Sequence, residues 1–427
     1  MTTPLDALDA LRHEARSLDR ADPLSRFRDE FVFEDEDLLY FDGNSLGRLP
    51  KRTAALVAHS VGTEWGARLV RGWNEGWVDA PRRVGDKLAR LLGAGPGEVA
   101  VSDGTSVNLF KLAVAALRAR RGRHTIVTDA LNFPSDLYVL EGAAALLEAG
   151  HRVVVVPSRD GIAVDDADLA AAITEDTALV SLSHVAYRSG FLHDIRAVTA
   201  LAHAAGALVL WDVSHSVGAV PIDLEASGAD LAVGCTYKYL NGGPGAPAFL
   251  YVRRELLETL QNPIPGWFSR HEPFSFRGGY EPARDLSRFL VGTPPILSLV
   301  AAEAGVDLAL EAGVGPAREK TIALGEFLVR LWETFLERRG VALQSPREAA
   351  RRGAHVSFAH PEGLAVDRAL IAEMNVIPDF RPPDVVRFGL SPLTPRFSDL
   401  VEGVARFRRV LDEERWRRYA GAGPAVT

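Results

Sequence analysis

Between about residue 97 and residue 255, short runs of β-branched residues alternate with longer stretches rich in Ala and Leu. This alternation predicts a mostly parallel sheet, because parallel strands need crossover helices to join them. Strands are expected at 124–128, 152–157, 178–183, 207–212, 230–236 and 248–252, and helices at 135–149, 166–173 and 194–205. Ligands of open α/β sheets bind beyond the carboxyl ends of the strands, so residues that follow a strand are the candidates for function.

The remainder of the chain has a different pattern. Residues 256–300 are rich in Pro, Gly and aromatic residues and predict an irregular segment. One long helix is predicted over 300–338 and a final helix over 399–419, with strands between them at 341–344, 355–358 and 385–388. We therefore expect a large α/β domain over 51–310, a smaller C-terminal α+β domain over 311–427, and an N-terminal segment over 1–50.

Composition excludes several classes of protein. The chain has 427 residues, 47% of them hydrophobic, which is enough for a large core. Its net charge of −8 is spread without a basic stripe, so a nucleic-acid partner is not expected. No apolar run approaches the roughly 20 residues that span a bilayer, so no membrane partner is expected either. A single cysteine, Cys235, excludes an internal disulfide and a cysteine-based metal site, and we predict a cytoplasmic protein with no metal.

Lysine is rare in this chain, because 43 of the 48 basic residues are arginines. Lys238 follows the mostly apolar run 231–237, whereas the other lysines (51, 87, 111 and 320) have polar neighbours or fall on expected helix surfaces. An ammonium group beside an apolar strand is costly unless it is paired or deprotonated. Lysine, unlike arginine, can lose its proton and form a Schiff base, which is our hypothesis for Lys238. The alternative is a strand-end lysine that reaches solvent.

Asp212 ends the expected strand 207–212, and Lys238 ends the next one. A carboxylate in this position often only caps the following helix. Two neighbouring parallel strands would, however, bring the carboxylate and the amine to the same end of the sheet. Pyridoxal phosphate (PLP) enzymes need this pair, the amine to bind the cofactor's aldehyde and the carboxylate to keep its ring nitrogen protonated.

Other residues could complete such a site. The segment 102–106 contains Thr105 and Ser106 and leads into a helix, whose free N–H groups and positive dipole end attract a phosphate. Phe133 follows a strand and could stack on an aromatic ring, although a turn aromatic covering the core is the commoner case. Arg387, in the strand 385–388, could grip a substrate carboxylate with its planar fork, and a salt bridge within the strand is the alternative.

Taken together, these motifs resemble kynureninase, a PLP enzyme of the aspartate aminotransferase fold (fold type I). The resemblance is carried by 212–218 and 235–245 and covers nearly the whole chain in order, through the segments 40–47, 105–109, 133–136, 266–268, 293–295 and 387–393. It implies a three-layer α/β/α large domain with a mostly parallel seven-stranded sheet and a smaller α+β domain. It also implies a homodimer with the active site at its interface. The segment 1–50 would contribute to the small domain and to the dimer.

The resemblance implies roles for the matching residues. Lys238 would hold the cofactor, Asp212 would pair with its ring nitrogen, and Tyr237 would relay the final proton. The other cofactor-binding residues would be Thr105, Ser106, Phe133, Asp136, Ser183, His215 and Tyr237, with Trp267 and Thr293 from the partner subunit. The substrate-binding residues would be Arg387, Trp73, Asn44 and Ser45.

The implied reaction is hydrolysis of L-kynurenine to anthranilate and L-alanine, in the kynurenine pathway of tryptophan degradation. Family members that prefer the 3-hydroxylated substrate carry His at the position of Trp73 and Asn at that of Thr293. Without those partners a ring hydroxyl would go unpaired, so we expect a preference for unsubstituted kynurenine.

Other functions remain open at this point. A cysteine desulfurase of the same fold would need a cysteine on a mobile loop, and the only cysteine here stands in the lysine's own strand. An aminotransferase or epimerase would differ in its products. A non-catalytic scaffold would have no reason to keep Lys238, Asp212 and Arg387 together.

Overall fold

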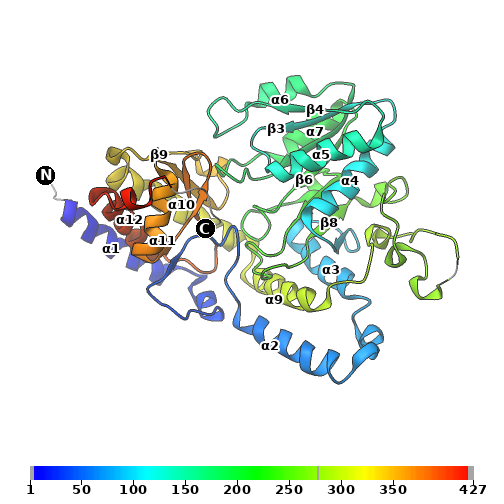
Figure 1. The fold of residues 1–427 in the computed structure, drawn as a ribbon, viewed down its shortest axis with the longest axis horizontal. Coiled ribbons are helices and arrows are strands. Elements are labelled where there is room, and N and C mark those ends of the chain that lie inside the picture. Colours follow the sequence, from blue (N-terminus) through cyan, green and yellow to red (C-terminus); the bar gives the residue numbers. More distant parts are fainter. Residues whose placement is uncertain (1–3, 277, 422–427) are drawn as a thin grey trace.

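A seven-stranded sheet forms the centre of the larger lobe in the computed structural model, which describes residues 4–276 and 278–421 (Figure 1). The strand order is β2-β8-β7-β6-β5-β3-β4. The strands are β2 (Val99–Val101), β3 (Thr125–Asp129), β4 (Arg152–Val156), β5 (Thr177–Ser183), β6 (Leu208–Asp212), β7 (Leu231–Gly234) and β8 (Phe249–Val252). The run from β7 to β4 is parallel, whereas β8 is antiparallel to both β7 and β2. The predicted mostly parallel sheet is confirmed, and β2 is a strand that the sequence pattern did not indicate.

Helices cover both faces of this sheet, because successive side chains along each strand point to opposite faces. In β6, Val209 and Trp211 belong to a core shared with α3, α7 and α9, whereas Leu208 and Leu210 belong to a second core shared with α4 and α5. The helices of this lobe are α2 (Lys51–His59), α3 (Ala80–Leu92), α4 (Thr105–Ala119), α5 (Pro134–Leu147), α6 (Asp166–Ala172), α7 (Ile195–Ala204), α8 (Leu224–Ser227) and α9 (Ile296–Ala312). The three-layer α/β/α architecture is therefore confirmed.

The smaller lobe is built on a four-stranded antiparallel sheet in the order β12-β13-β10-β9. Its strands are β9 (Ala342–Leu343), β10 (His355–Ala359), β12 (Asp379–Arg381) and β13 (Val385–Gly389), and β1 (Leu39–Tyr40) pairs with β11 (Val376–Ile377) beside them. The helices α10 (Val314–Phe335), α11 (Gly363–Met374) and α12 (Phe397–Asp412) complete a separate hydrophobic core. The predicted α+β lobe is confirmed.

The N-terminal segment connects the two lobes. Helix α1 (Pro4–Ala21) packs on α12 in the smaller lobe, whereas α2 lies against α9 beneath the larger lobe (Figure 1). The chain between them therefore crosses from one lobe to the other. Residues 1–3 of the predicted segment 1–50 lie outside the described residues.

Several predicted elements were wrong in their bounds. The single helix expected over 300–338 is two helices, because Gly313 (φ 79°) separates α9 from α10. The helix expected over 399–419 ends at Asp412, and a 3₁₀ turn follows at Arg415–Tyr419. The irregular segment 256–300 contains short 3₁₀ turns at Trp267–Ser269, Pro273–Ser275 and Leu286–Phe289, and α9 begins inside it.

Two of the other lysines, which the sequence placed among polar neighbours or on helix surfaces, are buried. Lys111 is fully buried, pairs with Asp103 at 2.7 Å and donates to the carbonyl of Phe289 at 2.7 Å. Lys320 is buried and pairs with Asp22 at 2.7 Å. Burial alone therefore does not distinguish Lys238, and its surroundings must do so. Among the described residues, no helix is long and apolar enough to span a membrane.

Candidate active site

Lys238 lies in the loop after β7, four residues beyond the strand end at Gly234, so the prediction that it ends the strand was wrong. Its Nζ shares a hydrogen bond of 2.9 Å with Nε2 of His215, which follows β6. The same Nζ lies 5.9 Å from the centre of the Phe133 ring and 5.8 Å from that of Tyr237. Because β6 and β7 are adjacent and parallel, the loops after them meet at one edge of the sheet.

Two glycines hold the loop of Lys238 in place. Gly47 donates its N–H to the carbonyl of Tyr237 at 2.8 Å, and a Cβ on Gly47 would overlap the carbonyl oxygen of Lys238. A Cβ on Gly305, in α9, would overlap the carbonyl oxygen of Leu240. The N-terminal segment and α9 therefore fix the backbone around the lysine by close approaches that only glycine permits.

Replacing Gly305 by alanine is expected to push this loop away from α9 and to lower kcat/KM by about 10²-fold, because a displacement of about 1 Å can cost that much. Gly315→Ala is a matched control, since a Cβ on that helical glycine meets nothing within 4 Å. Steady-state kinetics of both variants, with circular dichroism to verify folding, tests the expectation. Equal activity of Gly305→Ala and the control would contradict it.

Asp212 is the last residue of β6, as predicted, and it is buried. One carboxylate oxygen accepts the N–H of Ser214 at 2.8 Å, so a local turn accounts for part of its bonding. Ser183 ends β5 and lies beside Asp212 in register. Asp136 is the other buried carboxyl here: burial first, and then the charge of Asp212, raise the pKa of Asp136 well above its ordinary value.

His215 is buried, and its Nδ1 has no hydrogen-bond partner. Burial, followed by the charge of Lys238, holds the pKa of His215 well below its ordinary value. The imidazole is therefore neutral near pH 7 and can exchange a hydrogen bond with the amine. Its ring lies 5.7 Å from the ring of His355, a fully buried residue of β10 whose two nitrogens also lack partners. Buried polar atoms without partners normally indicate a missing ligand or water.

The N-termini of α4 and α5 meet next to these residues. The hydroxyls of Ser106 and Ser135 lie 2.9 Å apart, and the N-cap of α4, Gly104, provides no side-chain cap. Phe133 is the N-cap of α5, so this contact connects the start of α4 to the ring beside Lys238. Thr105 opens α4, as the sequence indicated. Uncapped N–H groups at such a junction can bind a phosphate.

Tyr237 and Ser183 both interact with neighbouring side chains of the protein. The adjacent Cys235 thiol, and then burial, raise the pKa of Tyr237, so its hydroxyl keeps its proton near neutral pH. The hydroxyl of Ser183 donates to Oδ1 of Asn132 at 2.6 Å, and the same oxygen accepts the N–H of Phe133 at 2.9 Å. Asn132 thus fixes both neighbours, a role that the sequence did not indicate.

Arg387 is fully buried in β13 and forms a second cluster, with Asn44 and Ser45. Its Nε donates to Asp379 at 3.0 Å, its Nη2 donates to Ser45 at 3.0 Å, and its Nη1 donates to the carbonyl of Tyr187. When the amide oxygen of Asn44 faces the guanidinium, it accepts from Nη2 at 2.9 Å and from Nε at 2.8 Å. The charge of Arg387 also contributes to the lowered pKa of His215, so this cluster adjoins the first one.

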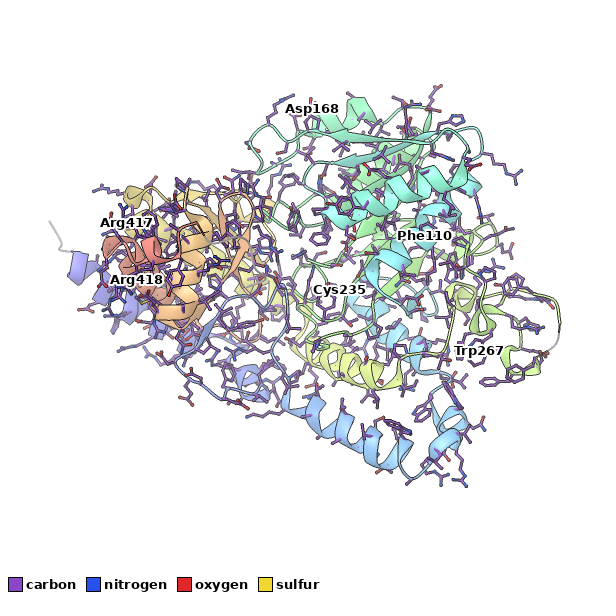
Figure 2. The ribbon with its side chains drawn as sticks, in the orientation of Figure 1. Phe110, Asp168, Cys235, Trp267, Arg417 and Arg418 are labelled. Atoms are coloured by element: carbon purple, nitrogen blue, oxygen red, sulfur yellow. The ribbon has the colours of Figure 1, made fainter. Side chains whose placement is uncertain are left out.

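Trp73, Trp267 and Thr293 are not brought to Lys238 within one chain. Trp73 packs against Phe268, with ring centres 6.5 Å apart, and Phe268 packs against Trp267 at 4.8 Å. Figure 2 places Trp267 at the outer edge of the larger lobe, far from Cys235 in the middle of the molecule. Thr293 is exposed. Trp73, Phe268 and Trp267 form an aromatic group of their own.

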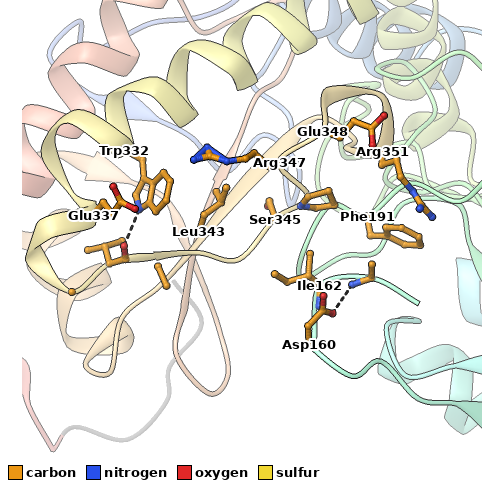
Figure 3. A pocket seen from close by; sticks show the side chains of 15 residues that line it. Asp160, Ile162, Phe191, Trp332, Glu337, Leu343, Ser345, Arg347, Glu348 and Arg351 are labelled. Carbon is orange, nitrogen blue, oxygen red and sulfur yellow. Dashed lines mark hydrogen bonds between the residues drawn. The ribbon is translucent and has the colours of Figure 1, made fainter. Parts of the chain in front are cut away.

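A cavity of about 780 Å³ lies elsewhere, between the β9 edge of the smaller sheet and the loop after β4 (Figure 3). Its walls include Phe191, Trp332 and Leu343, together with Arg347 and Arg351. None of the predicted site residues lines it, and it contains no lysine. Its size alone does not make it the site of chemistry.

The residues around Lys238 fit PLP. They provide an amine, a carboxylate at the neighbouring strand end, an imidazole with a free nitrogen, an exposed aromatic face on Phe133 and the uncapped start of α4. This combination matches the aldehyde, ring nitrogen, ring face and phosphate of the cofactor.

Comparison with known proteins decides the family. The class-V aminotransferase profile matches residues 74–376. Kynureninase from Pseudomonas fluorescens is 43% identical over 410 residues, which cover 95% of this chain and 96% of that protein. Kynureninase from Burkholderia pseudomallei is 44% identical over 411 residues, with coverages of 95% and 97%. The chain belongs to the kynureninase family.

Solved structures support the same fold at lower identity. A C-DES variant with glycine covalently linked to its PLP cofactor is 20% identical with a TM-score of 0.76, and the match covers 87% of this chain and 97% of that one. A cysteine desulfurase from Thermococcus onnurineus is 21% identical with a TM-score of 0.72, at coverages of 93% and 97%. Fold type I is thereby confirmed for this kynureninase family member.

Sequence reasoning missed several residues that contact the predicted ones. These are Asn132, Tyr187, His355, Asp379 and Arg381. Asn132 stood inside a segment that interrupts the strand pattern, which was a usable signal. Asp379 and Arg381 belong to a short edge strand, β12, that the pattern did not predict.

Proposed function

We propose that this protein is a PLP-dependent kynureninase that hydrolyses L-kynurenine to anthranilate and L-alanine. Family membership supports the proposal, and one observation carries it: the Lys238 amine, bonded to a neutral His215 and near Asp212, adjoins the buried Arg387 cluster. An amine that can bind a carbonyl and a cation that can bind a carboxylate suit an α-amino acid substrate.

We propose the following cofactor roles. Lys238 would hold PLP, Asp212 would pair with its ring nitrogen, and Phe133 would stack on its ring. The phosphate and ring oxygen would be held by Thr105, Ser106, Ser183, His215 and Tyr237, and Asp136 would belong to the same ring-binding segment as Phe133. When bound, PLP supplies the electron sink that lets the Cβ–Cγ bond of the substrate break.

The chain's own groups move the protons. The neutral His215 ring orients the amine, because its Nε2 lies within hydrogen-bond distance of Nζ of Lys238, at 2.9 Å. The Lys238 amine would carry a proton to and from the substrate's α-carbon. Tyr237 keeps its phenolic proton near neutral pH and can donate it in the last step. Arg387, Asn44 and Ser45 orient the substrate through its carboxylate.

We propose a homodimer in which Trp267 and Thr293 complete the partner's site. Two observations support it. These residues lie apart from Lys238 in their own chain, and large apolar side chains are exposed around them. Val70 and Phe276 are 74% and 75% exposed, and Trp65 is 56% exposed. Apolar groups exposed at this density usually mark an interface.

We also propose a domain division and a cellular location. We divide the chain into the segment 1–50, a large domain over 51–310 and a small domain over 311–427, since separate cores lie on the two sides of Gly313. We also propose a cytoplasmic location, because the single cysteine is free and buried.

A cysteine desulfurase activity is disfavoured. Such enzymes need an accessible thiolate, and burial raises the pKa of Cys235, which is 1% exposed. The likeness to desulfurase structures therefore concerns the fold.

The enzyme is expected to prefer L-kynurenine to 3-hydroxykynurenine by roughly 10-fold or more in kcat/KM. Trp73 supplies bulk and Thr293 a short hydroxyl, so neither provides the partner that a ring hydroxyl needs. Steady-state kinetics with both substrates measures the ratio. Equal kcat/KM values for the two substrates would contradict this expectation. If neither substrate yields its anthranilate product, the proposed function itself is contradicted.

A further inference from the structure

The guanidinium of Arg387 is already largely occupied. Its Nε and Nη2 both donate to the Asp379 carboxylate, at 3.0 and 2.5 Å, and Nη2 also donates to Ser45. Its Nη1 donates to the carbonyl of Tyr187. A guanidinium has five N–H groups, and these partners take four of them. The two-pronged grip on a substrate carboxylate that the sequence suggested is therefore filled by Asp379, and Arg387 alone offers one free N–H.

Arg381 stands beside it with unused donors. Its Nη2 donates to the same oxygen of Asp379 at 2.5 Å and to Ser45 at 3.2 Å, while its Nε is buried without a partner. The Arg381 side chain is 30% exposed, in contrast to 1% for Arg387. Its charge contributes to the lowered pKa of both His215 and His355, so it lies close to the histidines beside Lys238.

We propose that Arg381 is a second carboxylate-binding residue and that Asp379 is the positioning residue that holds the two guanidiniums side by side. The substrate carboxylate then bridges the free N–H of Arg387 and the unused donors of Arg381. The inference rests on the proposed role of Arg387 in the kynureninase reaction and adds residues to it.

The charges around the pair are consistent with one bound carboxylate. Burial, and then the charge of Asp379, raise the pKa of Asp42 to about 7, and burial raises that of Asp367 to about 8. Below pH 7 both carboxyls are mostly neutral. The positive charges of the two guanidiniums are then opposed by the one negative charge of Asp379. One positive charge remains for the substrate. Removing the charge of Arg381 leaves the substrate carboxylate without its cationic partner in a buried site, which is costly.

The test compares substrates with and without the carboxylate charge, using the holoenzyme. In Arg381→Gln we expect KM for L-kynurenine to rise about 10-fold or more with kcat within about threefold, because the lost contact binds ground state and transition state alike. KM for L-kynurenine methyl ester should stay unchanged, so the preference for the acid over the ester falls about 10-fold. Arg381→Lys, which keeps the charge, should recover part of that preference.

Arg152→Gln serves as the control, because Arg152 is 61% exposed and pairs with Asp176 at the opposite end of the sheet. A purely structural role for Arg381 would raise KM for acid and ester equally, and that result overturns the inference. So does an unchanged acid preference in Arg381→Gln while Arg387→Gln loses it. If both variants keep the acid preference, the proposed role of Arg387 is overturned as well. If the wild-type enzyme releases no anthranilate, the proposed function itself is overturned.

Discussion

Replacing Lys238 by alanine is expected to lower kcat/KM for L-kynurenine by about 10⁴-fold or more, because the variant loses the covalent anchor and the proton carrier together. His215 cannot substitute for it. Burial keeps its imidazole neutral, but a ring nitrogen cannot take the place of a primary amine on the cofactor's aldehyde. The same variant should lose the visible absorbance of lysine-bound PLP, which borohydride reduction removes from the wild-type protein.

Lys51→Ala is the matched control, since Lys51 is an exposed lysine at the start of α2. It should retain both the absorbance and the activity. Cofactor absorbance measured on both variants, with anthranilate fluorescence for the rate, separates the two outcomes. A Lys238→Ala protein that still forms a borohydride-sensitive cofactor bond would contradict the assignment, as another amine would then hold PLP.

Replacing Asp212 by asparagine is expected to lower kcat by about 10²- to 10³-fold, with weaker PLP binding. Asparagine keeps an oxygen that can accept the N–H of Ser214, so the local turn should survive. It removes the negative charge that would keep the cofactor's ring nitrogen protonated, and without that proton the ring accepts electrons poorly.

A capping role for Asp212 predicts a different result. Asp194 caps α7 by accepting the N–H of Ala197 at 3.0 Å, so Asp194→Asn measures what loss of charge at a cap costs. We expect that variant to keep nearly full activity. If Asp212→Asn were equally mild, Asp212 would be a turn residue, and the proposed partner of the ring nitrogen would have to be another carboxyl, such as Asp136.

Alternation along the sequence was sufficient to predict the parallel part of the large sheet, because β3, β5, β6 and β7 are buried along their whole length. The helices α5 and α7 are also long enough to show as separate Ala/Leu-rich stretches. The predicted parallel pairing also placed Asp212 and Lys238 correctly at the same edge of the sheet, although Lys238 lies in the loop after its strand. That loop depends on close approaches of Gly47 and Gly305, which are distant in sequence, and no local pattern reports them.

Other features depended on long-range pairing and were not predictable locally. β8 is antiparallel to β7 because the chain returns through the loop 235–248, which contains no crossover helix. The break at Gly313 interrupts a continuous helical pattern, because α9 joins the core of one lobe and α10 the core of the other. The ion pair between Arg387 and Asp379 depends on the pairing of β12 with β13. β12 has only three residues, which is too short for a recognisable strand pattern.

The most direct test of the account is the product balance of the purified protein, supplied with PLP and L-kynurenine. Anthranilate, followed by its fluorescence, and L-alanine, measured by amino-acid analysis, should appear in equal amounts. Neither should form with the Lys238→Ala protein. Transfer of the substrate's amino group to an oxoacid acceptor, or consumption of L-kynurenine without anthranilate, would contradict the account and identify a different reaction on the same fold.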